Sequence, residues 1–248
     1  MDLREAIPDE ARRHPWEVAR ARFFHDVLHR GGRLRGPVNA LDIGAGDGWF
    51  ARQLAPRLAP SSTITCCDAN YTDTWLTTHP DEDRLRFRRS PAGSRGGVVL
   101  LLDVLEHVED DGGLLRSSVE ANLLPGGVVL LSVPAWSQLF SAHDRWLGHH
   151  RRYSPSAARA LVASSGLRIE REGGLFHGLL LPRALQSLAE HIFPGSEAAA
   201  AERALWSHGE IVTTAVEAAL SIDNAFSRMA SSVGWTLPGL SWWALCTA

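Results

Sequence analysis

Short apolar runs follow one another along the chain, and most are rich in β-branched residues and end at a polar or turn-forming residue. Runs of this length and composition are typical of β-strands. The expected strands are residues 38–43, 63–67, 85–89, 97–102, 128–133, 167–172 and 240–247. The run at 97–102 is the most apolar, which predicts a central parallel strand buried on both faces.

Helical patterns alternate with these runs. Residues 16–30 place apolar side chains at helical spacing, and the pair Gly31 and Gly32 ends the pattern. Further helices are expected at 49–58, 71–78, 112–123 and 155–166. This alternation predicts an α/β fold with a doubly wound, mostly parallel, seven-stranded sheet.

The stretch from 176 to 232 does not continue the alternation, because its pattern is mostly helical. We therefore expect a single domain over residues 1–248, with a helical cap insertion at 177–235 before the last strand. The apolar side chains of this segment are candidates for lining an acceptor pocket or for packing against the sheet.

A glycine-rich loop follows the first expected strand and leads into a helix. Its glycines are Gly44, Gly46 and Gly48, and glycine permits positive φ and a close approach of backbone to a ligand. A dinucleotide site would need glycine where Trp49 stands, and a Walker loop would need the lysine that this chain lacks. Two interpretations of the loop remain: it binds a cofactor of another kind, or it is a tight turn without a ligand.

The second expected strand ends at Asp68, twenty positions after Gly48. A carboxylate at this place in a nucleotide-binding fold accepts hydrogen bonds from both hydroxyls of a ribose. The glycine loop and Asp68 together therefore favour a nucleoside cofactor over an empty turn.

Charge and cysteine content narrow the function classes. The net charge is −3 and all 25 positive side chains are arginine, so no basic field favours nucleic acid. The sequence has no apolar run long enough for a membrane span and no secretory signal pattern. Cys66, Cys67 and Cys246 show no zinc spacing and no convincing disulfide pair, which favours a reducing cytoplasm.

Four segments in the expected order resemble motifs of the class I S-adenosylmethionine-dependent methyltransferases. The glycine loop is similar to their first motif, and Asp68 matches their ribose-binding acid. Residues 102–108 are similar to their fourth-strand motif, and 123–127 to the turn before their fifth strand. The resemblance covers about residues 14–175, and the opening helix resembles that of a bacterial subgroup whose substrates are largely unassigned.

The resemblance implies S-adenosylmethionine as cofactor and S-adenosylhomocysteine as product. In the enzymes that the chain resembles, an aromatic and an arginine on the opening helix close over the cofactor, acids contact the ribose and the methionine end, and the fourth-strand motif faces the sulfonium. The implied cofactor residues are Trp16, Arg20, Asp42, Gly44, Gly46, Asp68, Ala69, Asp103, Val104 and His107. The family often places an acid near the adenine, and residues 90–97 contain none.

The densest polar cluster lies at 141–153, after the fifth expected strand. His143, His149 and Tyr153 are the candidate catalytic residues, because a histidine serves as a general base near neutral pH. His143 next to Asp144 suggests an oriented base, and a solvated loop is the alternative. The segment also resembles a motif in bacterial family members of unassigned substrate.

Asp103, Glu106 and His107 resemble the metal-binding motif of some O-methyltransferases, including enzymes for small-RNA 2′-O and quinol-precursor methylation. His143 or His149 would complete such a set. Because many methyltransferases carry similar residues without a metal, we expect no metal here. Glu106 as a cap of the following helix is the alternative.

The function that these observations predict is methyl transfer to a small-molecule acceptor, as in secondary metabolism, or to a peptide. The acceptor atom, oxygen, nitrogen or carbon, stays open. A protein that binds S-adenosylmethionine for regulation or for another reaction such as cyclisation is the alternative. A dehydrogenase is disfavoured by Trp49.

Overall fold

The computed structural model describes residues 13–192 and 206–248. Seven strands form one sheet in the order β3-β2-β1-β4-β5-β7-β6, and β7 alone runs antiparallel to its neighbours β5 and β6. The strands are β1 Asn39–Ile43, β2 Thr63–Cys67, β3 Leu85–Arg88, β4 Gly96–Leu102, β5 Leu123–Pro134, β6 Arg168–Leu175 and β7 Ser241–Thr247. The predicted α/β fold with a mostly parallel seven-stranded sheet is confirmed.

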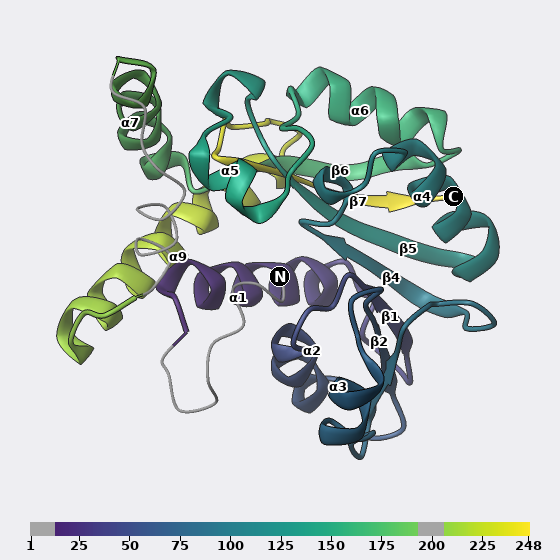
Figure 1. Ribbon diagram of the computed structural model, residues 1–248. Helices are drawn as coiled ribbons and strands as arrows, with labels where there is room; N and C mark the ends of the chain where they lie inside the picture. Colours follow the sequence, from purple (N-terminus) through teal and green to yellow (C-terminus); the bar gives the residue numbers. More distant parts are fainter. Residues whose placement is uncertain (1–12, 193–205) are drawn as a thin grey trace.

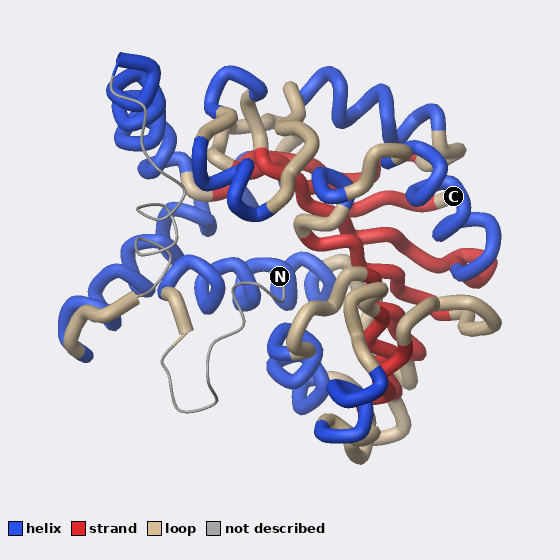
Figure 2. Tube along the Cα trace, viewed as in Figure 1, coloured by secondary structure: helices blue, strands red, loops and turns tan. Residues whose placement is uncertain are grey.

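Helices cover both faces of the sheet (Figures 1 and 2). One face carries α1 Pro15–Arg30, α2 Trp49–Leu54, α3 Asp73–Thr78 and α9 Glu210–Ser232. The other face carries α4 Asp111–Ser117 and α6 Pro155–Ser164, with the short helix η3 Leu105–His107. Each face therefore has its own hydrophobic core.

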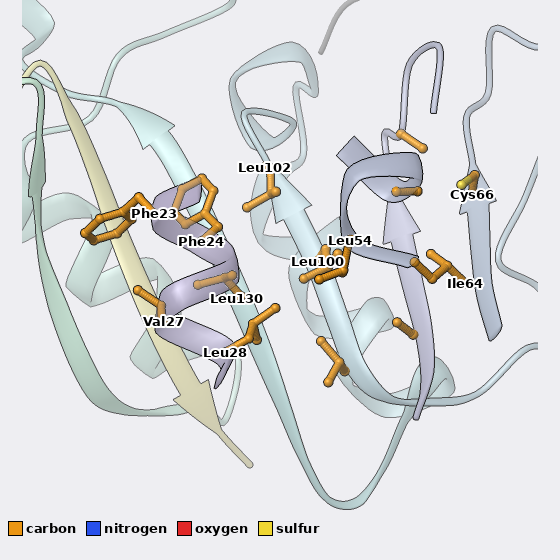
Figure 3. Packing of buried hydrophobic residues seen from close by; sticks show 14 of the residues in the cluster. Phe23, Phe24, Val27, Leu28, Leu54, Ile64, Cys66, Leu100, Leu102 and Leu130 are labelled. Carbon is orange, nitrogen blue, oxygen red and sulfur yellow. The ribbon is translucent and has the colours of Figure 1, made fainter. Parts of the chain in front are cut away.

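Strand alternation divides the apolar residues between these two cores. On β4, Leu100 and Leu102 pack under α1 and α2, whereas Val99 and Leu101 face α4 and α6. Figure 3 shows Phe23, Phe24, Val27 and Leu28 of α1 on the first face, with Leu130 of the sheet near Val27 and Leu28, and Leu100 beside Leu54 of α2. The apolar stripe predicted for residues 16–30 is thus the contact that holds α1 to the sheet.

Several boundaries differ from the sequence prediction for local reasons. The helix expected at 49–58 ends at Leu54 and continues as the 3-10 turn η2 Ala55–Arg57, because Pro56 has no N–H to donate. Thr72 caps α3 by accepting a hydrogen bond from the N–H of Trp75, so α3 begins at Asp73 and not at Tyr71. In place of one helix at 112–123, α4 ends at Ser117 and a π-helical turn, η4 Ser118–Asn122, follows it.

Residues 141–153 include a short helix, α5 Ala142–Leu147, which the apolar pattern of the sequence does not predict. Ser141 and Asp144 form a capping box at its start, and Gly148 ends it in the left-handed conformation. The short helix η5 Ser137–Leu139 precedes it.

The described part of the predicted insertion at 177–235 consists of η6 His177–Leu179, α7 Leu180–Ile192 and α9. The long helix α9 packs against α1 and β6, whereas α7 stands away from the sheet (Figure 1). The role of this segment as a cap over an acceptor stays a prediction. Within the described ranges, no helix is long and apolar enough to cross a bilayer.

Truncating Phe24 tests whether α1 is held by the first core. Phe24 is 0% exposed, so Phe24→Ala should lower the free energy of unfolding by about 3–5 kcal/mol. Phe226 on α9 is 57% exposed, and Phe226→Ala should cost about 1 kcal/mol or less. Urea denaturation measures both, and equal losses would contradict this packing.

Candidate functional site

A cavity of about 910 Å³ lies at the carboxyl ends of β1, β2 and β4. The strand order reverses between β1 and β4, and ligands of open α/β sheets bind at such a switch point. Six predicted cofactor residues line the cavity: Gly44, Asp68, Ala69, Asp103, Val104 and His107. Leu147 and Gly148 at the end of α5 also line it, so the glycine loop and the segment after β5 face one space.

The glycine loop is held against the end of β2. The backbone N–H groups of Gly44 and Ala45 donate to the carbonyl oxygen of Cys67 at 2.7 and 3.1 Å. Gly44 has a φ of 74°, and a Cβ there would lie 2.5 Å from Cγ2 of Val104. Only glycine therefore fits at this position, because both the conformation and the close approach exclude a side chain.

Asp68 is buried at the end of β2 and lines the cavity. Its Oδ2 accepts from the N–H of Gly46 at 3.0 Å, and its Oδ1 accepts from the N–H of Asn70 at 2.9 Å. A carboxylate oxygen has two lone pairs, so each keeps one for a further donor. The carboxylate predicted to bind a ribose is thus fixed in place with acceptor capacity left over.

Tyr71 supports this loop and was missed by the sequence reasoning. Its hydroxyl donates to the carbonyl oxygen of Gly46 at 2.6 Å, and its ring stacks on Trp75 at 3.8 Å. The sequence pattern placed Tyr71 in the helix expected at 71–78 and gave no signal for this contact.

Trp16, Arg20 and Asp103 form a chain of contacts at the end of β4. The guanidinium of Arg20 lies 4.5 Å from the ring centroid of Trp16 and makes an ion pair with Asp103. Asp103 also accepts a hydrogen bond from the hydroxyl of Ser132 at 2.8 Å. Arg20 and Asp42 line a smaller hollow that shares Gly44 with the cavity, so the predicted arginine lies beside the glycine loop.

Backbone strain collects at the same edge of the sheet. In the described residues, the non-glycine positions with positive φ are Asp103, Trp136 and Phe176, at 56°, 66° and 60°. They follow the carboxyl ends of β4, β5 and β6. Such conformations cost about 1–3 kcal/mol each and cluster at ligand sites, which marks this edge as the functional one.

Asp42 sits at the centre of an acidic group. Burial, together with the neighbouring carboxylates of Asp68 and Asp47, raises the pKa of its carboxyl to about 7, and the guanidinium of Arg20 acts in the opposite direction. Burial also raises the pKa of Glu17. A cationic ligand would relieve this repulsion, and perturbed acids in a cleft are typical of functional sites.

The predicted adenine side contains no acid, as the sequence indicated. Arg89, Ser90 and Pro91 line the cavity there. The Nε of Arg89 donates to the carbonyl oxygen of Tyr71 at 2.7 Å, which ties this strand end to the loop after β2.

Asp144 organises the polar cluster after β5. Its Oδ1 lies 3.0 Å from Nδ1 of His149 and accepts from Nε of Arg152 at 2.7 Å. Burial alone would raise the pKa of this carboxyl, but hydrogen bonds from His149, Arg152 and Ser141 hold it well below its usual range. The oriented pair in this structure is therefore Asp144 with His149, five residues apart, and sequence adjacency had suggested His143.

None of the three predicted catalytic residues is among the residues that line the cavity. The ring of His149 packs edge to face on that of His107, which does line it, with centroids 4.5 Å apart. His143 stacks near Trp146 on α5, and burial lowers the pKa of its imidazole. The hydroxyl of Tyr153 donates to Asp111 at 2.7 Å.

The stability of an Asp42→Asn variant tests the electrostatics. Because the folded protein holds the Asp42 proton up to a pKa of about 7 and the unfolded chain releases it near 3.8, this group destabilises the fold increasingly between pH 4 and 7. The variant should match the wild type near pH 3 and unfold at higher denaturant concentration at pH 7. Asp83→Asn, at a 98% exposed side chain, should show no such trend. A pH-independent difference would contradict the account.

Comparison with solved structures supports the fold. A proposed sarcosine dimethylglycine methyltransferase from Galdieria sulphuraria is 18% identical with a TM-score of 0.55, over 91% of this chain and 83% of that one. Coclaurine N-methyltransferase, bound to N-methylheliamine and S-adenosylhomocysteine, is 12% identical with a TM-score of 0.55, over 92% and 70%. The [4+2]-cyclase SpnF is 14% identical with a TM-score of 0.51, over 90% and 78%.

At these identities the structures establish the fold alone, and the cyclase demonstrates that the fold also serves other reactions. A search of curated protein sequences returns no significant match. Residues 11–172, more than half of the chain, match the family model described as a methyltransferase domain. The predicted methyltransferase assignment is confirmed: this chain belongs to the methyltransferase domain family, and S-adenosylmethionine stays its predicted cofactor.

Proposed function

We propose that this methyltransferase transfers the methyl group to a small-molecule or peptide acceptor that occupies the same cavity as the cofactor. The observation that carries the proposal is the two-sided lining of that cavity. Asp68 and Gly44 stand on one side, and His107, Leu147 and Gly148 on the other. A volume of about 910 Å³ is near the upper end for small-molecule sites, which leaves room for donor and acceptor together.

On the donor side, Asp68 accepts the two ribose hydroxyls, with Ala69 beside it. The backbone at Gly44 and Gly46 approaches the methionine part, as the lack of space for a Cβ at Gly44 supports. Asp42 and the Arg20–Asp103 ion pair face the charged amino-acid end. The sulfonium and ammonium charges favour the ionised form of Asp42, which burial otherwise disfavours.

On the acceptor side, the nucleophile approaches from the side of His107 and His149. Of the three predicted catalytic residues the proposal retains His149, because Asp144 orients it and its ring contacts His107. Methyl transfer is an in-line displacement, and holding both reactants in alignment is worth up to about 7–11 kcal/mol. The helical segment at 177–235 would cover the acceptor and exclude water.

Composition and burial support two further features of the protein. With a net charge of −3 the protein is not expected to act on nucleic acid. Cys66, Cys67 and Cys246 are buried and free, as in a reducing cytoplasm. A role in secondary metabolism would fit a small-molecule acceptor.

Removing the Asp68 carboxylate tests the donor side. Asp68→Ala should weaken the binding of S-adenosylhomocysteine at least about tenfold, because two hydrogen bonds to a charged acceptor are lost. Asp83→Ala, at an exposed carboxylate, should bind like the wild type. Isothermal titration measures both, with NAD as a negative control. Tight NAD binding without S-adenosylhomocysteine binding would overturn the proposed function.

Substituting Gly44 tests the close approach. Gly44→Ala introduces a Cβ 2.5 Å from Val104, whereas Gly93→Ala introduces one into open space at nearly the same φ, 76° against 74°. Both variants pay the cost of a side chain at positive φ, about 1–2 kcal/mol of stability. Only Gly44→Ala should lose affinity for S-adenosylhomocysteine, by about tenfold or more. Equal affinities would refute the placement of the cofactor over Gly44.

A further inference from the structure

Three ligand-type side chains converge beside the cofactor cavity. Glu106 and His107 lie on η3 after β4, and His149 lies between α5 and α6. One carboxylate oxygen and one nitrogen of each imidazole all lie within 4.8 Å of one another. The N–H of His150 donates to the carbonyl oxygen of Glu106 at 2.7 Å, which ties the two segments together.

The carboxylate of Glu106 is the unusual member of this group. It is 0% exposed, and neither oxygen has a hydrogen-bond partner among the described residues. It does not cap the next helix, because Asp110 caps α4 by accepting from the N–H of Gly113 at 2.9 Å. Burying a carboxyl group without a hydrogen-bond partner costs free energy, and a ligand at these oxygens would offset that cost.

The second unusual feature is the support behind His149. Nδ1 of His149 lies 3.0 Å from the carboxylate of Asp144, which is itself fully buried and held by Ser141 and Arg152. This contact places the proton on Nδ1 and leaves the lone pair of Nε2 available. Histidines that bind metals are oriented by a carboxylate in this way.

We propose that Glu106, His107 and His149 bind one divalent transition-metal cation. Two imidazoles and one carboxylate are a donor set that suits Zn²⁺, Mn²⁺, Co²⁺ or Fe²⁺, whereas Mg²⁺ prefers oxygen ligands. Metal–ligand bonds of about 2.0–2.2 Å require the three ligand atoms to lie closer together than they do here. Rotation of the three side chains would bring them to that distance. On sequence alone, Asp103, Glu106 and His107 with His143 or His149 formed such a candidate set and no metal was expected, and the support of His149 by Asp144 did not follow from the sequence.

Asp103 is excluded from the set because it pairs with Arg20. The remaining coordination positions would face the cavity, because His107 lines it. This placement suggests the class of acceptor, and the suggestion rests on the proposed function. A cation bound there would lower the pKa of a coordinated acceptor hydroxyl, so the acceptor is an alcohol or a phenol.

Methyl transfer to a hydroxyl needs no reagent besides donor and acceptor. The hydroxyl proton leaves to solvent, and an oxygen lone pair forms the new bond to the methyl carbon. The carbon–sulfur bonding pair returns to sulfur, which converts the sulfonium into the neutral thioether of S-adenosylhomocysteine.

Co²⁺ titration followed by visible absorption tests the site, because the d–d bands report nitrogen and oxygen ligation. The wild-type protein, treated with a chelator and dialysed, should bind one Co²⁺ per chain. Glu106→Gln removes one ligand with little change in shape and should weaken Co²⁺ binding at least about tenfold, as should His149→Gln. Glu109→Gln, at an exposed position three residues further on, should bind Co²⁺ like the wild type.

S-Adenosylhomocysteine affinity on the same preparations separates this inference from the proposed function. Lost Co²⁺ binding with retained S-adenosylhomocysteine binding in Glu106→Gln supports the metal site. Wild-type protein that binds S-adenosylhomocysteine but not Co²⁺, or equal Co²⁺ affinity in wild type and Glu106→Gln, overturns the metal site and leaves methyl transfer intact.

Discussion

The close approach of the glycine loop to the end of β4 is the constraint on which the rest of the site depends. Gly44 leaves no room for a Cβ against Val104, so the carboxyl ends of β1 and β4 are brought together at the point where the strand order reverses. The same loop donates to Cys67 and Asp68, which fixes the end of β2. A cavity bounded by three strand ends follows from these contacts, and it contains the acid that a ribose requires.

The charged side chains around this cavity determine which kind of ligand it favours. Asp42 and Glu17 are buried acids whose pKa values are raised, and Arg20 pairs with Asp103 at positive φ. These are unfavourable arrangements for a protein without a ligand, and they cost stability in the free state. A cofactor that carries positive charge would offset the repulsion between these acids. Its binding would therefore regain the stability that the free protein loses.

The sequence predicted the fold and the positions of the glycine loop and Asp68 well, because both depend on local signals. Periodicity located all seven strands to within a few residues, except that β5 and β6 extend further, and the glycine loop and Asp68 stand where their motifs predicted. The acceptor side depends on contacts between distant segments, which periodicity does not report. Asp144 therefore pairs with His149 and not with its neighbour His143, and the burial of Glu106 has no sequence signal. The support that Tyr71 gives to Gly46 was hidden for the same reason.

The central claim is that S-adenosylmethionine binds between Gly44, Asp68 and Asp103, with its ribose on Asp68. A crystal structure of the protein with S-adenosylhomocysteine tests this most directly. The account predicts both ribose hydroxyls within hydrogen-bonding distance of the Asp68 carboxylate and the methionine part over Gly44. Density for S-adenosylhomocysteine at another position, or a ribose that does not contact Asp68, would contradict it.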